Sequence, residues 1–202
     1  MRIPRFVVPA ALGIAALLLS TGCITFPQLK DRVVHLSTNG TVRGFFHAHG
    51  TLNETSDSQT IRLADSLDVA QLLHDAGIDP DMVDTITVAT VTYRVLVPDA
   101  NPARTITGTV SIQGQPLIDS FSANAGAATG DVGVVPDAAG VGAINTLLGH
   151  VLQEVRSGSP ITDQLTYGVV GTSSPTDVNT DFVYEIQIKV NIVGHAKTKM
   201  IT

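Results

Sequence analysis

The sequence predicts a mainly β domain of the α+β class, an antiparallel β-sandwich or curled sheet with one long amphipathic helix and one short helix. The strongest observation is the last apolar segment, where every second residue is apolar: Phe182, Tyr184, Ile186, Ile188, Val190 and Ile192. Mostly polar residues lie between them, so one face of this strand is expected to be buried and the other solvated. Such alternation argues against a doubly wound parallel sheet, whose strands are apolar on both faces. Most connections are also short enough for antiparallel pairing.

The N-terminal part of the domain is predicted to begin with a β-hairpin. Segments 33–38 and 41–51 flank Asn39-Gly40, and both of these residues tolerate the positive φ that a type I′ turn requires. The polar stretch 53–60 that follows is predicted to be a loop.

A second hairpin is predicted in the middle of the chain. Segment 85–97 alternates, but the alternation slips between Val88 and Val91, which indicates a β-bulge. It is expected to pair with 105–112 across a turn at 98–102. The remaining predicted strands are 117–123 and 161–171.

The long helix is predicted over 138–156, where apolar residues recur at helical spacing after Asp137, a favourable N-cap. Gly158 is expected to end it before Pro160. A short helix is predicted to begin at Asp65 or Ser66 and to end at Gly77. The long helix is expected to cover one sheet face or close one end of the sandwich; the alternative is that it encloses an apolar tunnel.

Composition indicates one folded domain over 33–202, because 44% of the 202 residues are hydrophobic and only 15% are charged. Without Arg2 and Arg5, which belong to the N-terminal segment discussed next, 10 basic residues face 18 acidic ones. This acidic balance argues against nucleic acid as a partner.

The first residues are typical of an export signal. Two arginines precede a run from Phe6 to Leu19 that contains no polar side chain. The run is shorter than the roughly 20 apolar residues that a membrane-spanning helix needs, and it reaches that length only if it continues to Phe26. Residues 1–22 are therefore predicted to be a signal peptide, with an uncleaved membrane helix as the alternative.

The segment Leu19-Ser20-Thr21-Gly22-Cys23 resembles the lipobox of bacterial lipoproteins, whose cysteine is acylated and becomes the mature N-terminus. The resemblance implies that 23–32 are a lipidated N-terminus and tether, and that the membrane is a partner through this anchor. Ile24 after the cysteine favours the outer membrane in a host that has two membranes. Cys23 is the only cysteine, so an intrachain disulfide is excluded.

His47-Ala48-His49 is the one local pattern that resembles a metal site, because residues two apart on a strand project from the same face. A catalytic zinc needs a third protein ligand, and His35 can supply it only if the Asn39-Gly40 hairpin forms. The sequence contains no HExxH and no Gly-x-Ser-x-Gly, and its glycines do not follow a phosphate-binding order. No catalytic residue and no cofactor are therefore predicted.

Three functions are open at this point. The first is a non-enzymatic envelope lipoprotein with a structural or partner-binding β domain, which an exposed apolar patch would favour. The second is a carrier of a lipid or another hydrophobic ligand, which a large apolar cavity would favour. The third is a metal-binding protein or metal-dependent enzyme that uses His47 and His49, which requires a further ligand on that face.

The lipoprotein hypothesis predicts the mass of the mature chain. Protein purified from its own membranes is expected to begin at Cys23 and to be heavier by its acyl groups, and Cys23→Ala is expected to abolish the modification. Intact-mass spectrometry of both proteins measures this difference. An unmodified chain that still begins at Met1 would contradict this hypothesis and would favour the alternative of an uncleaved membrane helix.

Overall fold

The computed structural model describes residues 30–51, 55–96, 105–124, 130–176 and 179–200. The chain divides into two compact units, one of residues 1–33 and 197–202 and the other of residues 34–196. The described residues of the first unit, 30–33 and 197–200, belong to strands. The predicted signal peptide, Cys23 and the predicted turn at 98–102 lie outside the described residues. The last residues of the predicted tether, from Lys30, belong to a strand.

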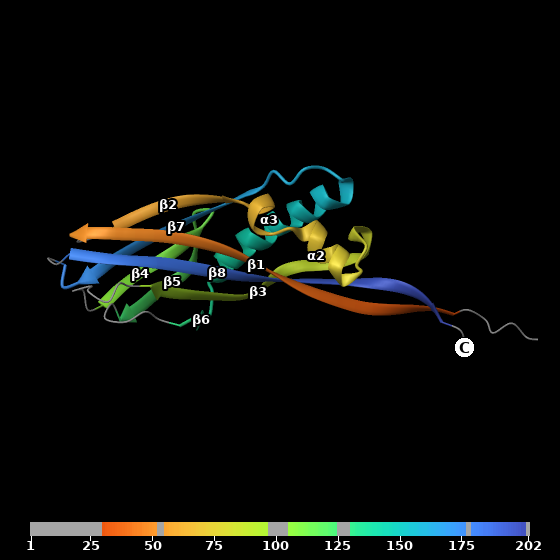
Figure 1. The fold of residues 1–202 in the computed structure, drawn as a ribbon, viewed down its shortest axis with the longest axis horizontal. Coiled ribbons are helices and arrows are strands. Elements are labelled where there is room, and N and C mark those ends of the chain that lie inside the picture. The colour runs from red at the N-terminus through yellow and green to blue at the C-terminus, as the bar shows by residue number, and fades with distance from the viewer. Residues whose placement is uncertain (1–29, 52–54, 97–104, 125–129, 177–178, 201–202) are drawn as a thin grey trace, which may run out of the picture. The chain divides into compact units, whose positions relative to one another are not determined.

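Two four-stranded antiparallel sheets pack as a sandwich, which confirms the predicted fold class (Figure 1). Sheet A has the order β1-β8-β3-β6, and sheet B has the order β2-β7-β4-β5. This order within the described residues is that of a jelly roll. The strands of sheet A are β1 (Lys30–Thr51), β8 (Asn179–Met200), β3 (Val83–Leu96) and β6 (Val132–Val134). Those of sheet B are β2 (Thr55–Arg62), β7 (Gln164–Ser174), β4 (Thr105–Ile112) and β5 (Gln115–Asn124).

The long helix is α3 (Ala138–Ser157), and both of its predicted ends are observed. The Asp137 carboxylate accepts a hydrogen bond from the backbone N–H of Ala139, and Gly158 adopts the left-handed conformation with φ 67°. The described helices are otherwise short: α1 (Leu63–Ser66), α2 (Val69–Ala76) and the 3₁₀ turn η1 (Pro80–Met82). None of the helices in the described part of the chain is both long and apolar enough to cross a membrane.

The short predicted helix is split in two. Leu67 has φ −140° and ψ 90°, which interrupts the helix, and Asp68 rather than Asp65 or Ser66 caps α2 by accepting from the Gln71 N–H. The predicted end at Gly77 is observed, with φ 67°. The break lets both Leu67 and Val69 turn into the core.

α3 packs against β3 and β5, and it completes the hydrogen bonding of the bulged strand. The register of β3 against β8 shifts between Val88 and Thr90, which confirms the predicted bulge. The backbone N–H of Val88 donates to the side-chain oxygen of Asn145 on α3, over 2.9 Å. A main-chain donor beside the bulge is thereby satisfied by the helix rather than by a strand.

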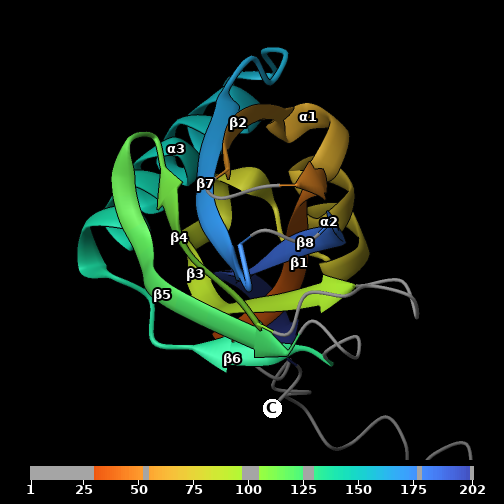
Figure 2. The same ribbon diagram turned by 90° about the vertical axis from the view of Figure 1, so that its left-hand side faces the viewer.

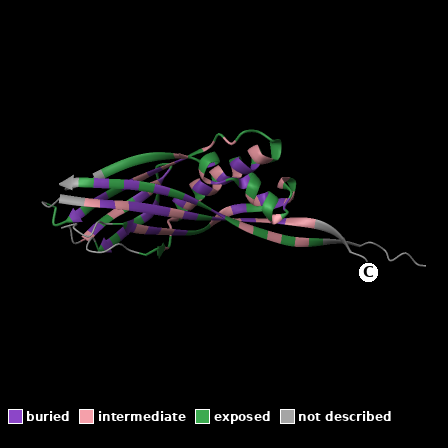
Figure 3. Cartoon of the chain, in the orientation of Figure 1, coloured by how far each residue is buried: buried purple, intermediate pink, exposed green. Residues whose placement is uncertain are grey.

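The inner faces of both sheets and the buried face of α3 form one core (Figure 3). Tyr93, Tyr167 and Tyr184 are all buried, as their alternation with Val and Ile predicts. Tyr184 lies at the centre of an aromatic cluster, with ring centroids 5.5 Å from Tyr93 and 4.5 Å from Phe121. The buried α3 residues belong to this packed core, so the predicted alternative of a helix enclosing a tunnel is not what the described residues form.

The predicted hairpin at Asn39-Gly40 is wrong, because β1 continues through both residues as one strand. Glycine is needed there for a close contact. A Cβ on Gly40 would lie 2.1 Å from Leu67 Cδ1, so the bare backbone of the glycine makes room for this leucine side chain to pack onto the strand.

Two further predictions are corrected. Most of the predicted loop 53–60 belongs to β2. The sequence shows no alternation of apolar and polar residues here, because the residues of this strand are mostly polar and exposed. The predicted pairing of β3 with β4 is also wrong: β3 pairs with β8 and β6, whereas β4 pairs with β5 and β7. The chain crosses between the two sheets at this point instead of turning back within one of them.

Two glycines of α3 give a matched test of its packing. A Cβ on Gly140 would lie 2.4 Å from the Pro116 carbonyl oxygen, whereas one on Gly149 would meet nothing within 4 Å. Gly140→Ala is expected to lower the free energy of unfolding by about 1–3 kcal/mol through overpacking. Gly149→Ala is expected to raise it by about 0.5–1 kcal/mol through helix propensity. Urea unfolding measures both, and equal effects would contradict the packing of α3 on β5.

Candidate functional site

The outer face of sheet A carries half-exposed apolar side chains. Side-chain contacts join Arg43 to Glu185 and His47 to Asp181 across β1 and β8. In an antiparallel pair, the positions midway between two such contacts face each other, which places Phe45 beside Val183. Val183 is the register partner of Leu96 on β3.

Phe45, Val183 and Leu96 therefore form an apolar row across three strands. The Phe45 side chain is 49% exposed and that of Leu96 is 37% exposed, while Val183 between them is half-buried. An outer sheet face is ordinarily polar, because water rather than the core covers it. These side chains are thus the unusual feature of the face.

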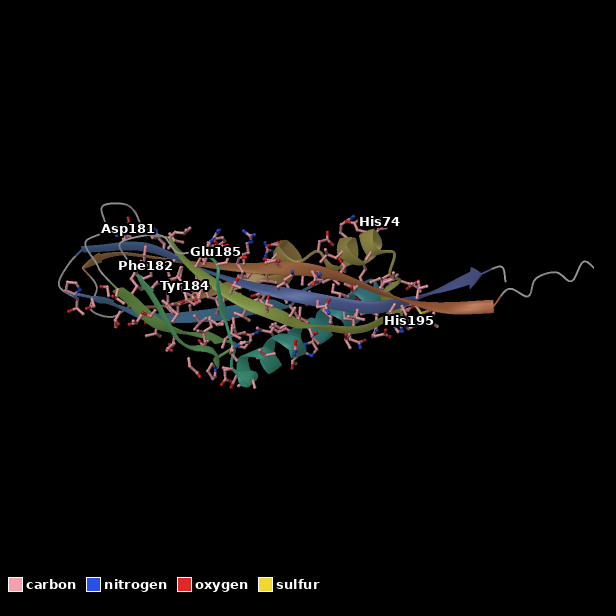
Figure 4. The ribbon with its side chains drawn as sticks, turned by 90° about the horizontal axis from the view of Figure 1, so that it is seen from below. His74, Asp181, Phe182, Tyr184, Glu185 and His195 are labelled. Atoms are coloured by element: carbon pink, nitrogen blue, oxygen red, sulfur yellow. The ribbon has the colours of Figure 1, made fainter. Side chains whose placement is uncertain are left out.

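A charged row of Arg43, Glu185 and Arg94 lies next to the apolar row (Figure 4 labels Glu185). Arg43 Nη1 is 3.5 Å from Glu185 Oε1, and Arg94 donates to Oε2 through both Nε and Nη2. Gln187 Nε2 also donates to Oε1, over 3.1 Å. The Glu185 side chain has no exposed surface, so these donors replace the water that a carboxylate otherwise needs.

The alternation of β8 predicts that Glu185 is solvated, because it lies on the polar face of the strand. This prediction is wrong, since the side chain is buried. The Glu185 side chain points to the outer face of the sheet, as predicted. The arginines of β1 and β3 lie over its carboxylate and shield it from water. Their side chains remain 54% and 34% exposed, so the row presents guanidinium groups to solvent. Two cations against one anion leave a positive charge in excess.

His47 and His49 project from the same face of β1, on the other side of the apolar row. Their ring centroids are 5.7 Å apart, and His47 Nε2 lies 2.8 Å from Asp181 Oδ1. His35 lies further along the same uninterrupted strand, so the turn that was expected to bring it near does not form. No group of three or more His, Cys, Asp or Glu residues that could hold a metal is found among the described residues. The two-histidine metal site stays a prediction.

Tyr167 anchors the site from below. Its hydroxyl donates to the Phe45 carbonyl oxygen, which ties β7 of sheet B to β1 of sheet A. Burial raises the pKa of the Tyr167 phenol, so the group stays protonated and able to donate. Gly44 makes room for the ring, since a Cβ there would lie 2.9 Å from Tyr167 Cε1. The backbone of Phe45 is thus held by the core while its side chain faces solvent.

The fold and the site define a jelly-roll β-sandwich with a mixed apolar and cationic outer face. No family model and no curated protein matches the chain. Among solved structures it is similar to the decameric BFDV capsid protein, with 11% identity, 80% of this chain and 99% of that chain covered, and a TM-score of 0.40. It is also similar to Desmodium yellow mottle tymovirus, with 8% identity, 99% and 97% covered, and a TM-score of 0.30. Neither likeness bears on what this chain does.

The charged row predicts a stability difference between two carboxylate variants. Glu185→Gln removes an anion that is fully buried under two arginines, and we expect a loss of about 1–3 kcal/mol in the free energy of unfolding. Asp65→Asn removes the exposed pair with Arg62, and the expected loss is below about 1 kcal/mol. Urea unfolding of the two variants measures the difference. Similar small losses would mean that the charged row does not stabilise the sheet.

Proposed function

We propose that this chain is a non-enzymatic lipoprotein of the cell envelope, anchored through Cys23, whose jelly-roll domain binds a partner protein through the outer face of sheet A. The lipobox resemblance supports the anchor and the address. The observation that carries the binding proposal is the apolar row of Phe45, Val183 and Leu96 beside the charged row. In a host with two membranes, the outer membrane is the favoured location.

The apolar row supports a binding role because its exposed carbon surface gains nothing in water. Covering an apolar surface contributes about 25 cal/mol per Å² that is removed from solvent. A phenylalanine that protrudes beside exposed arginines also has the composition of a protein interface, where aromatic residues and arginine are enriched.

The charged row indicates the chemistry of the partner. Glu185 neutralises one guanidinium, so Arg43, with a side chain that is 54% exposed, can pair with an additional anion. This cationic spot stands out on a chain whose formal net charge is −6. The surface that fits here has an apolar centre, which covers Phe45, and a carboxylate that reaches Arg43.

The other two functions have unequal support. A carrier of a hydrophobic ligand is favoured by one observation, a cavity that lies apart from the outer face of sheet A. A metal-dependent enzyme would need a third ligand beside His47 and His49, and no such group occurs among the residues that the structure describes. We therefore propose no catalytic activity.

Photo-crosslinking from two positions tests the proposed surface. A benzoylphenylalanine in place of Phe45 is expected to yield one discrete crosslinked protein in native envelopes. The matched control is Val135, which is 98% exposed and lies outside the apolar row. Since Val135 is the more exposed position, unspecific crosslinking would be stronger there.

Arg43→Glu, combined with the crosslinker at position 45, is expected to weaken the product, because it places an anion opposite the partner's carboxylate. Mass spectrometry of the products identifies the bound chain. Equal crosslinking from both positions, or no product from position 45, would contradict the proposal. A product of two copies of this chain would mean that the face is a homodimer interface instead.

A further inference from the structure

A cavity of about 720 Å³ lies where β5 of sheet B runs beside β6 of sheet A (Figure 2). It is lined by strands of both sheets and is separate from the outer face of sheet A, which contributes no residue to it. Its volume falls in the range of about 300–1,000 Å³ that is typical of small-molecule sites. None of its lining residues comes from α3.

Two opposed glycines make room for the Phe121 ring in the cavity wall. Gly108 on β4 is the register partner of Gly171 on β7 and also of Phe121 on β5. A Cβ on Gly108 would lie 2.6 Å from a Phe121 ring carbon, so the aromatic ring lies over the bare backbone. The pairing of β4 with β5 shifts register directly after Gly108, and such irregularities re-aim side chains next to binding sites. The two glycines and the register shift therefore position the Phe121 ring, which forms part of the apolar wall.

The lining combines an apolar wall with uncharged hydrogen-bonding groups. Its apolar side chains are those of Tyr93, Phe121, Val132, Val134 and Val170. Its hydroxyl-bearing residues are Thr107, Thr109, Ser120, Ser122 and Thr172. Among the described residues, none that lines the cavity carries a carboxylate, amine, guanidinium or imidazole. An ionised ligand would find no counter-charge among these residues, so the lining favours an uncharged one.

A buried hydroxyl next to the wall is without a partner. Tyr184 is in ring contact with both Tyr93 and Phe121, and it is fully buried. Its hydroxyl has no hydrogen-bond partner among the described residues, whereas the Tyr93 hydroxyl donates to the Ser122 carbonyl oxygen. Burial raises the pKa of the Tyr184 phenol, so it remains a neutral donor. Most buried hydroxyls in folded proteins are paired, and this unpaired one belongs to a ring that packs behind the two aromatic residues of the lining.

We propose that this cavity is a binding site for an uncharged small molecule with an apolar, ring-sized body and a hydroxyl or carbonyl group. The apolar body packs against Phe121 and the valines of β6, and the polar group bonds to the serine and threonine hydroxyls. The site is independent of the partner-binding face, because the two share no residue.

Two dyes with the same ring skeleton test this selectivity. N-phenylnaphthylamine is neutral, and anilinonaphthalene sulfonate carries an additional negative charge. Fluorescence titration of the intact mature chain is expected to show saturable binding of one neutral dye molecule. The sulfonate is expected to bind at least about tenfold more weakly, which corresponds to about 1.4 kcal/mol. Equal affinities, or no saturable binding of the neutral dye, would overturn the proposal.

Cavity-filling variants locate the bound dye. Val132→Phe adds a ring at a lining position that is 36% exposed, and Val170→Phe does so at one that is 41% exposed, so either can fill the site should the other misfold. Val193→Phe on β8 is the matched control outside the cavity. Lining variants with an unchanged urea midpoint are expected to lose neutral-dye binding, while the control retains it. Unchanged binding in folded lining variants would place the dye elsewhere and contradict the proposal.

Discussion

The structure depends on the insertion of its last strand into the middle of a sheet. β8 lies between β1 and β3, so sheet A cannot close until the C-terminal part of the chain is in place. The inner face of β8 supplies Phe182, Tyr184 and Ile186 to the core, and its outer face supplies the carboxylate on which the charged row is built. Such contacts are distant in sequence, so the entropy of closing long loops opposes them until the apolar faces meet. The core and the candidate site therefore depend on the same long-range pairing.

Local features could be predicted from the sequence, because they depend on neighbouring residues. The alternation of β8, the bulge after Val88 and the two ends of α3 follow from side-chain period, phase and capping. Pairing partners could not be predicted in this way. A hairpin was expected at Asn39-Gly40 because both residues tolerate a turn, but β1 continues through them as one strand. A second hairpin was expected between β3 and β4 because sequential strands often pair, but these two strands belong to opposite sheets.

The same distinction explains why the candidate site was only partly foreseen. His47 and His49 could be placed on one face because both belong to one strand. The burial of Glu185 depends on Arg43 and Arg94, which come from two other strands and reach it only in this register. Glycines were similarly ambiguous: Gly40 fits a turn by its conformational freedom, yet its role is to admit a leucine side chain. A glycine in the sequence does not by itself show whether it serves a turn or a close contact with a distant segment.

The two proposed binding regions use opposite electrostatic designs, and each depends on the packing beneath it. On the outer face of sheet A, the buried Glu185 holds two arginines in fixed positions, so less side-chain entropy is lost when a partner contacts them. Tyr167 fixes the backbone under Phe45 from the opposite sheet. In the cavity, the proposed selectivity comes from a described lining without charged groups, and the Phe121 ring of its wall packs over two glycines that meet across β4 and β7. One small domain can carry both arrangements because a close-packed core separates them. The core keeps the charged row away from the cavity and holds the backbone of both regions in place.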